Sequence, residues 1–152
     1  MIKKSKYNVD QTDKGKLRRT HNDILFDSEL ECRYYKYLLE LQIIGDVIEI
    51  ELQPKYCLFD KYIRKCDNKK ILAINYVSDF RITYKKDNLV KVVDTKGNPD
   101  SVSLIKRKML EGLNPDIDFH WISWSKIDGG WIEYDLLKEA RKLRKKAKQN
   151  NK

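Results

Sequence analysis

The sequence has few cysteines, few histidines and no long apolar run. Its three cysteines, Cys32, Cys57 and Cys66, form no CxxC pair and have no histidine nearby. This pattern argues against a disulfide framework and against a structural zinc site, so we expect reduced thiols in a cytoplasm. No segment approaches the ~20 apolar residues of a membrane span, and no basic start followed by an apolar run marks a signal peptide. We therefore expect a soluble, cytoplasmic protein.

Acidic residues are the minority among the charged ones. The 152 residues include 32 Lys or Arg and 23 Asp or Glu, which gives a formal net charge of +9 and a pI near 9.3. This balance favours a polyanionic partner over an acidic protein or a neutral metabolite, and it predicts salt-sensitive binding to nucleic acid. The alternative is that a Lys-rich composition only keeps the protein soluble.

Charge and apolar content divide the chain into three parts. Residues 1–21 contain seven Lys or Arg, two Asp and few apolar side chains, which predicts a flexible basic arm. Residues 22–135 are expected to form one folded domain, and residues 136–152 a basic terminal helix and tail. Apolar residues recur at helical spacing along one side of that helix: Leu136, Leu137, Ala140, Leu143 and Ala147.

Hydrophobic periodicity predicts a mixed α/β (α+β) fold, in which a central sheet is flanked by helices. Helical spacing covers Ser28–Ile43 and Val102–Leu113, the second with an apolar stripe of Val102, Ile105, Met109 and Leu113. Strand patterns cover Val47–Gln53, Lys55–Phe59, Ile71–Tyr84 with a bend near Ser78, Leu89–Lys96 and Phe119–Trp124. The polar stretch Asp60–Lys70 is expected to be a loop.

One short segment carries the most specific chemical signal. Asp94 and Lys96 lie two residues apart in an expected strand, just before Gly97, so both side chains share one face. A carboxylate can hold a divalent cation while a neighbouring ammonium orients or deprotonates water, and both groups serve phosphodiester cleavage. This pair makes a nuclease the leading hypothesis.

Two further acids stand at suggestive positions. Glu31 lies in the first turn of the helix expected from Ser28, and Asp79 interrupts an otherwise apolar strand that can pair with the strand of Asp94. Clustered carboxylates repel one another unless they share a cation or a proton, and oxygen-rich sites suit Mg²⁺ or Mn²⁺. A shared metal ion would explain all three acids.

Each of these acids also has an ordinary structural explanation. Ser28 and Glu31 form an S-x-x-E capping box, in which Glu31 only satisfies backbone donors at the helix start. Asp79 can pair with Arg81 or cap a bend. Asp94 and Lys96 can form an exposed ion pair of the kind found at many strand ends.

Four segments, taken in order, resemble the PD-(D/E)xK nuclease superfamily. They are Phe26–Glu31 (FDSELE), Leu52–Pro54 (LQP), Tyr76–Phe80 (YVSDF) and Val93–Gly97 (VDTKG). The stronger likeness is to a phage and prophage family of small Holliday-junction-resolvase-like endonucleases, and a more distant one is to the endonuclease subunit of heteromeric transposases. The likeness extends from about residue 26 to residue 124, and its specificity lies in the ordered set.

The resemblance implies a restriction-endonuclease-like core of helix, three strands, helix and strand, with the active site where the central strands splay. Asp79 and Asp94 would be metal ligands, with Glu31 contributing directly or through water, and the Thr95 carbonyl could complete the metal shell. Lys96 would position the attacking water and stabilise charge on the phosphate.

The resemblance also assigns Gln53 to the edge of the site, as in nucleases that carry the helix Glu and the strand Gln. Two positions depart from the family pattern. Ser78 occupies the place of the proline in the motif, and Asp94 stands for the commoner Glu.

Basic residues outside this cluster are candidates for phosphate contacts. Lys106 and Lys108 lie on one face of the second helix, although a solvated helix face is an equal explanation. Sequence-independent contacts are expected from both ends of the chain: Lys16, Arg18, Arg19, Arg141, Arg144 and Lys145. The tryptophans, in contrast, are expected to fill the core rather than stack on bases.

The sequence therefore predicts a Mg²⁺-dependent DNA endonuclease, with Mn²⁺ as a substitute, that acts on branched DNA such as four-way junctions during phage recombination. Two symmetric cuts across a junction require two active sites, so a homodimer is expected. If a phage encodes the protein, it would act in the cytoplasm of the bacterial host. Alternatives are restriction-like or transposon-end cleavage of linear duplex, a non-catalytic DNA-binding module of the same fold, and a Lys-rich interaction protein.

Overall fold

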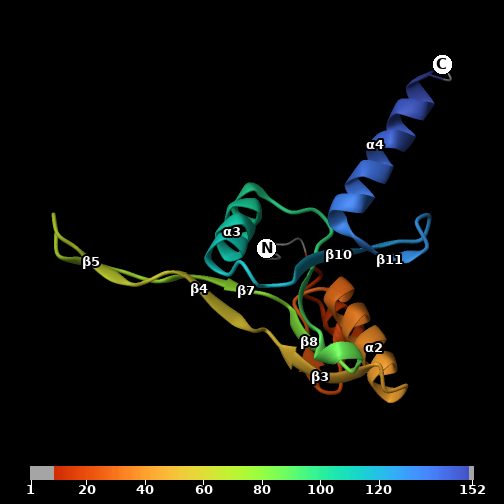
Figure 1. The fold of residues 1–152 in the computed structure, drawn as a ribbon, viewed down its shortest axis with the longest axis horizontal. Helices are drawn as coiled ribbons and strands as arrows, with labels where there is room; N and C mark the ends of the chain where they lie inside the picture. The colour runs from red at the N-terminus through yellow and green to blue at the C-terminus, as the bar shows by residue number, and fades with distance from the viewer. Residues whose placement is uncertain (1–8, 151–152) are drawn as a thin grey trace.

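A five-stranded mixed sheet forms the centre of the computed structural model, which describes residues 9–150. Its strand order is β11-β10-β9-β8-β3. Only β9 and β10 pair in parallel; the other neighbours are antiparallel. The strands are β3 (Val47–Leu52), β8 (Phe80–Tyr84), β9 (Val90–Thr95), β10 (Phe119–Ser125) and β11 (Gly130–Glu133). This arrangement confirms the predicted α/β class (Figure 1).

The helix α2 (Glu29–Ile43) covers one face of the sheet. Its buried side chains, including Tyr34 and Leu38, pack with Phe80, Ile82 and Val93 in the larger of two apolar clusters. The Ser28 hydroxyl caps the helix by accepting a hydrogen bond from the backbone N–H of Glu31. The predicted helix and its apolar face are both confirmed.

The helix α3 (Ser101–Leu113) lies on the other side, against β4 (Lys55–Phe59) and β7 (Ile74–Val77). The predicted apolar stripe of this helix is wrong. Val102, Ile105 and Leu113 are exposed, whereas Leu110 is fully buried beside Trp121. The face that meets the protein carries Lys106 and Arg107 beside Leu110, so most of it is polar and hydrophobic periodicity does not identify it. The apolar residues of the second cluster are Leu58, Tyr76, Val92, Leu110, Phe119 and Trp121.

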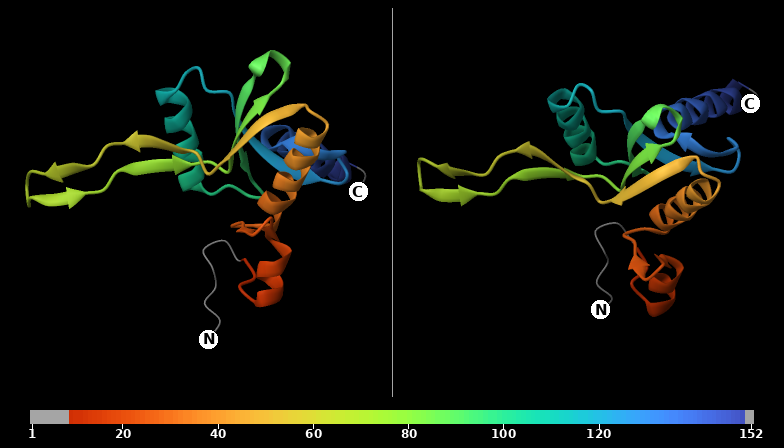
Figure 2. Two further views of the ribbon diagram at one scale, coloured as in Figure 1. Left: turned by 90° about the horizontal axis from the view of Figure 1, so that it is seen from below. Right: turned by 60° about the horizontal axis from the view of Figure 1, so that its bottom comes forward.

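A long two-stranded extension projects from the sheet (Figures 1 and 2). We call residues 55–77 the β-ribbon. In it β4 pairs with β7, and β5 (Tyr62–Arg64) pairs with β6 (Lys69–Ile71). The loop predicted over residues 60–70 is therefore wrong: β5 lies within that stretch, and β6 begins in it. Since both faces of the outer strands β5 and β6 meet solvent, these strands need no apolar alternation, and the usual sequence signal is absent.

The bend predicted near Ser78 is confirmed, because β7 ends at Val77 and β8 begins at Phe80. The edge strand β3 contains a bulge between Val47 and Glu49. This extra residue breaks the alternation of the strand, so Ile48 is exposed although it lies two positions before the half-buried Ile50. A short 3₁₀ turn, η1 (Lys86–Asn88), connects β8 to β9.

The N-terminal segment differs from the flexible arm predicted over residues 1–21. From residue 9 onward it is folded into α1 (Asp13–Arg18), β1 (Thr20–His21) and β2 (Ile24–Leu25). Arg19 is only 5% exposed, and its Nη1 donates to the Phe26 carbonyl at 2.6 Å. A buried guanidinium thus holds this segment together. Residues 1–8 lie outside the described part of the chain.

The last helix, α4 (Tyr134–Asn150), extends away from the sheet (Figure 1). Only its first turns pack on β10 and β11, where Leu137 is buried. Leu136 and Leu143, predicted to share the apolar side, are exposed. Within residues 9–150, the structure contains no helix with the length and apolarity that crossing a membrane requires.

Candidate active site

The three predicted acids meet at one end of the central strands. Phe80 lies opposite Val93 in the antiparallel register of β8 and β9, so the preceding Asp79 stands beside the following Asp94. Glu31 reaches the same place from the first turn of α2. All three line a pocket of about 570 Å³, together with Thr95 and Lys96. The pairing of β8 with β9 and the cap of α2 are what bring these distant residues together.

Asp79 is fixed by its neighbour across the strand pair. Its Oδ2 accepts two hydrogen bonds of 2.7 Å, from the backbone N–H and from the hydroxyl of Thr95. Burial raises the pKa of Asp79 well above its ordinary value, and the charges of Asp94 and Glu31 raise it further, against the opposing effect of the Thr95 hydrogen bonds. Thr95 therefore acts on Asp79 through its N–H and hydroxyl groups. A metal contact from its carbonyl stays a prediction.

Asp94 is only 2% exposed, although it is charged and lies at a strand end. Its Oδ2 is 2.9 Å from the Lys96 Nζ and also accepts a hydrogen bond from the Tyr76 hydroxyl. The Tyr76 oxygen in turn accepts from the Trp121 indole N–H at 3.0 Å. Because Asp94 is buried, its pair with Lys96 differs from the exposed surface pair that was the ordinary alternative.

Glu31 makes a contact at the start of its helix and also belongs to the acid cluster. Its Oε2 accepts a hydrogen bond from the backbone N–H of Asp27 at 3.1 Å, which is a helix-start contact. Its side chain is also buried and faces the other acids. Burial, followed by the charges of Asp27 and Asp94, raises the pKa of Glu31 to about 7, in opposition to hydrogen bonds from the backbone.

Gln53 does not join the cluster. Its side chain is exposed and is not part of the pocket lining, whereas its backbone N–H donates to the Asp79 carbonyl at 2.9 Å. Its positive φ of 52° turns the chain between β3 and β4. The Gln53 side chain is thus outside the pocket lining, and its predicted role at the edge of the site stays a prediction. Arg81 pairs with Glu51, at 3.3 Å, so Asp79 has no ion pair with it.

The donor set fits a hard divalent cation. Within residues 9–150 no group of three or more His, Cys, Asp or Glu side chains has the arrangement to hold a metal ion. Mg²⁺ needs fewer, since it is bound through one or two carboxylates while water and phosphate oxygens complete its shell. Asp79 and Asp94 are such a pair. The raised pKa values of Asp79 and Glu31 mean that a cation would relieve repulsion there.

Comparison with known proteins identifies a family for the chain. A family model described as "Protein of unknown function (DUF1064)" matches residues 4–128. The chain belongs to the DUF1064 family. The matched span contains the acid cluster, Tyr76 and the β-ribbon, and it ends before α4. No curated protein matches the sequence, and no solved structure matches it either.

The basic residues predicted to contact phosphates are held in different ways in this DUF1064 protein. Arg19 is buried, so its predicted role in binding nucleic acid is wrong. The Lys106 Nζ donates to the Asn75 carbonyl at 2.9 Å and anchors the β-ribbon. Arg144 is paired with Asp128. The remaining candidates have exposed side chains: Lys16, Arg18, Lys108, Arg141 and Lys145.

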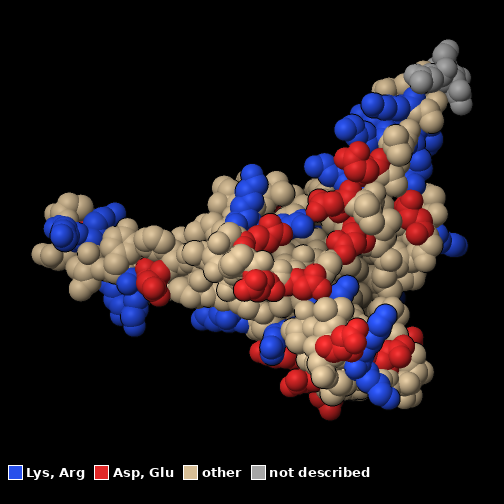
Figure 3. All heavy atoms as spheres, viewed as in Figure 1, with Lys and Arg blue, Asp and Glu red and all other residues tan. Residues whose placement is uncertain are grey.

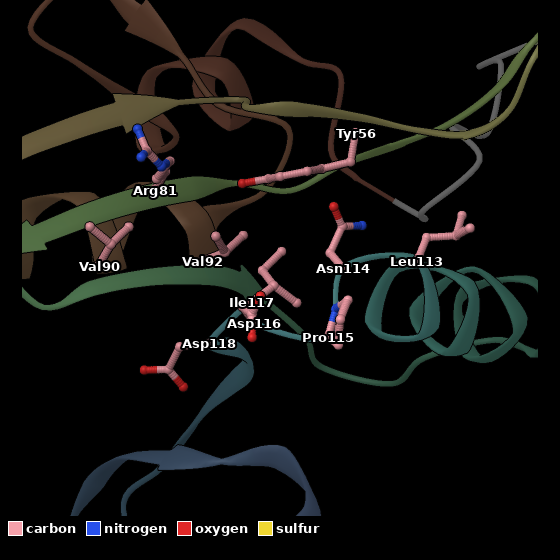
Figure 4. Close-up of a pocket in the computed structure, with 10 residues that line it drawn as sticks. All are labelled: Tyr56, Arg81, Val90, Val92, Leu113, Asn114, Pro115, Asp116, Ile117 and Asp118. Carbon is pink, nitrogen blue, oxygen red and sulfur yellow. The ribbon is translucent and has the colours of Figure 1, made fainter.

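A second pocket, of about 470 Å³, lies along the strands of the DUF1064 sheet (Figure 4). One part of it is lined by Tyr56, Arg81, Val90 and Val92, and residues 113–118 line the rest. The two pockets share no lining residue. None of the predicted site residues belongs to this second pocket.

Sequence reasoning missed the role of two buried side chains in the DUF1064 site. Tyr76 lies within one of the motif segments but was given no function, and Trp121 was expected only to fill the core. The structure does bury Trp121 in the core, and it also joins both residues to Asp94 through hydrogen bonds. A polar aromatic three residues before Asp79, inside an apolar strand, is the one available signal, because a buried tyrosine hydroxyl requires a partner.

Proposed function

We propose that this DUF1064 protein is a metal-dependent DNA endonuclease. The observation that carries the proposal is the convergence of Asp79, Asp94 and Lys96 in one pocket, with Glu31 beside them. A protein that only binds DNA gains nothing from buried acids where phosphates approach, since like charges repel. A nuclease needs such acids as well as the ammonium group.

The residues divide the chemistry between them. Mg²⁺, or Mn²⁺ in its place, supplies polarisation of the scissile phosphate and lowers the pKa of a water molecule when it is bound. Asp79 and Asp94 would hold it, with Glu31 at their side. The ammonium group of Lys96 lies 2.9 Å from Asp94 Oδ2, where it can orient the water and neutralise charge that develops on the phosphate. Thr95 keeps Asp79 in place through two hydrogen bonds.

Branched DNA is the proposed substrate, on the resemblance to Holliday-junction-resolvase-like phage endonucleases. Symmetric cutting of a four-way junction needs two active sites, and a homodimer would supply them. The net charge of +9 supports binding to DNA through phosphate contacts. The protein would then process recombination intermediates in the cytoplasm of a bacterial host.

The test is cleavage of labelled DNA by the wild type and by Asp94→Asn, with Mg²⁺, Mn²⁺ or EDTA. We expect metal-dependent cutting of four-way junctions by the wild type, and a loss of about 10³-fold in Asp94→Asn, because the variant lacks a charge at the reacting phosphate. Binding to the junction should persist. Asp116→Asn is the matched control, since Asp116 is exposed and lines the other pocket.

Other outcomes identify the alternatives. A wild type that binds junctions but cuts no DNA with any metal would contradict the nuclease proposal and leave a binding module. Cutting at one sequence of linear duplex, with intact junctions, would replace the resolvase assignment by a restriction-like one. Cutting confined to the ends of a transposon would favour the transposase-like alternative.

A further inference from the structure

We propose that the β-ribbon, residues 55–77, is a DNA-binding arm that holds the duplex next to the active site. This inference rests on the proposed function, because it takes DNA as the substrate of the acid cluster. It assigns a partner to a part of the chain whose outer end, residues 60–70, was predicted to be a polar loop. Three features of the β-ribbon support it: its attachment, its charge and its shape.

The β-ribbon is attached directly to the acid cluster. Val77, at the end of β7, lines the same pocket as Asp79 and Asp94. The Tyr76 hydroxyl donates to Asp94, and Lys106 of α3 holds the Asn75 carbonyl from the outside. The base of the β-ribbon and the reacting groups are therefore one structural unit. Any duplex with a phosphate in the pocket must pass close to that base.

The outer end of the β-ribbon is basic. Residues 60–70, which we call the ribbon tip, contain five Lys or Arg and two Asp, a net charge of +3. Every one of these residues is exposed, and basic side chains gather at this end of the molecule in Figure 3. Asp67 pairs with Arg64 at 2.6 Å, so the excess charge resides on lysines. Lysines at such a position bind phosphates without reading sequence.

The length and shape of the β-ribbon suit duplex DNA. About ten residues separate its base from its tip, and at about 3.3 Å per residue they span about 33 Å, close to one helical turn of B-DNA. Beyond the base, where α3 packs on β4 and β7, the two strands have no covering layer, and a two-stranded ribbon is a β structure that the major groove admits. Ile63 and Leu72, 66% and 73% exposed, can then contact base edges or sugars.

A second copy of the chain is the rival occupant, because exposed apolar side chains often mark protein interfaces. Charge favours DNA. A twofold pairing that lays the two β-ribbons side by side in the same direction would bring two tips of charge +3 together, and like charges there are destabilising. A polyanion, in contrast, is attracted by each lysine of the tip.

The test compares two triple variants of the full chain that remove the same charge. The tip variant is Lys65→Gln, Lys69→Gln and Lys70→Gln, and the control is Lys36→Gln, Lys85→Gln and Lys86→Gln. All six lysines are exposed. Fluorescence anisotropy in EDTA measures the Kd for labelled junctions over a range of salt concentrations, and circular dichroism checks that each variant is folded.

We expect the tip variant to bind about tenfold or more weakly than the control, with a salt-dependence slope smaller by up to about 3. The difference should vanish on DNA whose flanks are about 5 bp, half a helical turn, because the tip then meets no duplex. Equal binding by both triple variants would overturn the proposal. A second result would also overturn it: the wild type is a dimer by sedimentation, the tip variant is a monomer, and the tip variant still binds DNA normally. The β-ribbon would then bind a second copy of the chain.

This experiment separates the arm from the catalytic proposal, because binding in EDTA requires no hydrolysis. Tip-dependent binding by a wild type that never cuts DNA leaves the arm in place and removes the nuclease. If cutting is lost in Asp94→Asn but the tip variant binds DNA normally, the nuclease proposal stands and the arm proposal is removed.

Discussion

Asp94 depends on one buried hydroxyl group. In Tyr76→Phe the carboxylate loses the hydrogen bond from Tyr76, and the Trp121 indole N–H loses its acceptor. A buried polar group left without a partner costs about 1–3 kcal/mol, so we expect the free energy of unfolding to fall by about 2 kcal/mol or more. Urea unfolding in EDTA measures the change.

Tyr56→Phe is the control for this variant. Tyr56 lies opposite Tyr76 in the β-ribbon and is half-buried, but no hydrogen bond from its hydroxyl is present in the described part of the chain. Its free energy of unfolding should stay within about 0.5 kcal/mol of the wild type. Equal losses in the two variants would mean that the hydroxyl of Tyr76 is not what stabilises Asp94.

The residues of the site were predictable to different degrees. Asp94 and Lys96 follow from a two-residue spacing within one strand, which is local information. Asp79 follows from pairing of neighbouring antiparallel strands. Tyr76 could not be found in this way, because its contact with Asp94 depends on how the β-ribbon meets the sheet. The position of the Gln53 side chain could not be predicted from the sequence, because it depends on the positive φ that turns the chain at this residue.

Among the elements, α3 offers a direct test of which side chains hold it to the protein. Leu110 is fully buried and Ile105 is 60% exposed, on the same helix. Truncation of a buried leucine leaves a cavity, so Leu110→Ala should lower the free energy of unfolding by about 2–5 kcal/mol. Ile105→Ala should change it by less than about 0.5 kcal/mol. Thermal or urea unfolding distinguishes them, and a larger loss in Ile105→Ala would restore the predicted stripe.

The elements show where sequence patterns are informative. The helix α2 was predicted with its cap and its buried face, because it packs along its length against a sheet and so shows one continuous stripe. The strands β5 and β6 were missed, since a ribbon with two solvated faces has no apolar alternation to detect. The segment that contains α1 was predicted to be a flexible arm because it is rich in Lys and Arg. One of these residues, Arg19, is buried and holds the segment together, and its charge alone does not distinguish it from the exposed ones.

On the scale of the whole molecule, a chain with a net positive charge contains an acidic pocket. The net charge of +9 attracts a polyanion, while the pocket itself carries Glu31, Asp79 and Asp94. These buried acids destabilise the fold when all of them are ionised, as the raised pKa values of Glu31 and Asp79 indicate. The stability of the metal-free protein should therefore depend on pH through this one site.

The sign of that dependence follows from linkage. The pKa of Glu31 rises from 4.5 to about 7 on folding, so between these values the folded state binds more protons than the unfolded state, and stability falls as pH rises. Asp79 acts in the same direction. The Glu31 effect corresponds to about 3 kcal/mol. Urea unfolding in EDTA between pH 4.5 and 8 should show this fall in the wild type and a flatter profile in Glu31→Gln.

The exposed Glu40 of the same helix provides the control, because it is solvated in both states. Glu40→Gln should keep the wild-type profile. A flat profile in the wild type, or a steep one that survives in Glu31→Gln, would mean that the acid cluster does not set the pH dependence. Added Mg²⁺ should restore stability above pH 7, since a cation that binds only the folded state stabilises it and does so most where the acids are ionised.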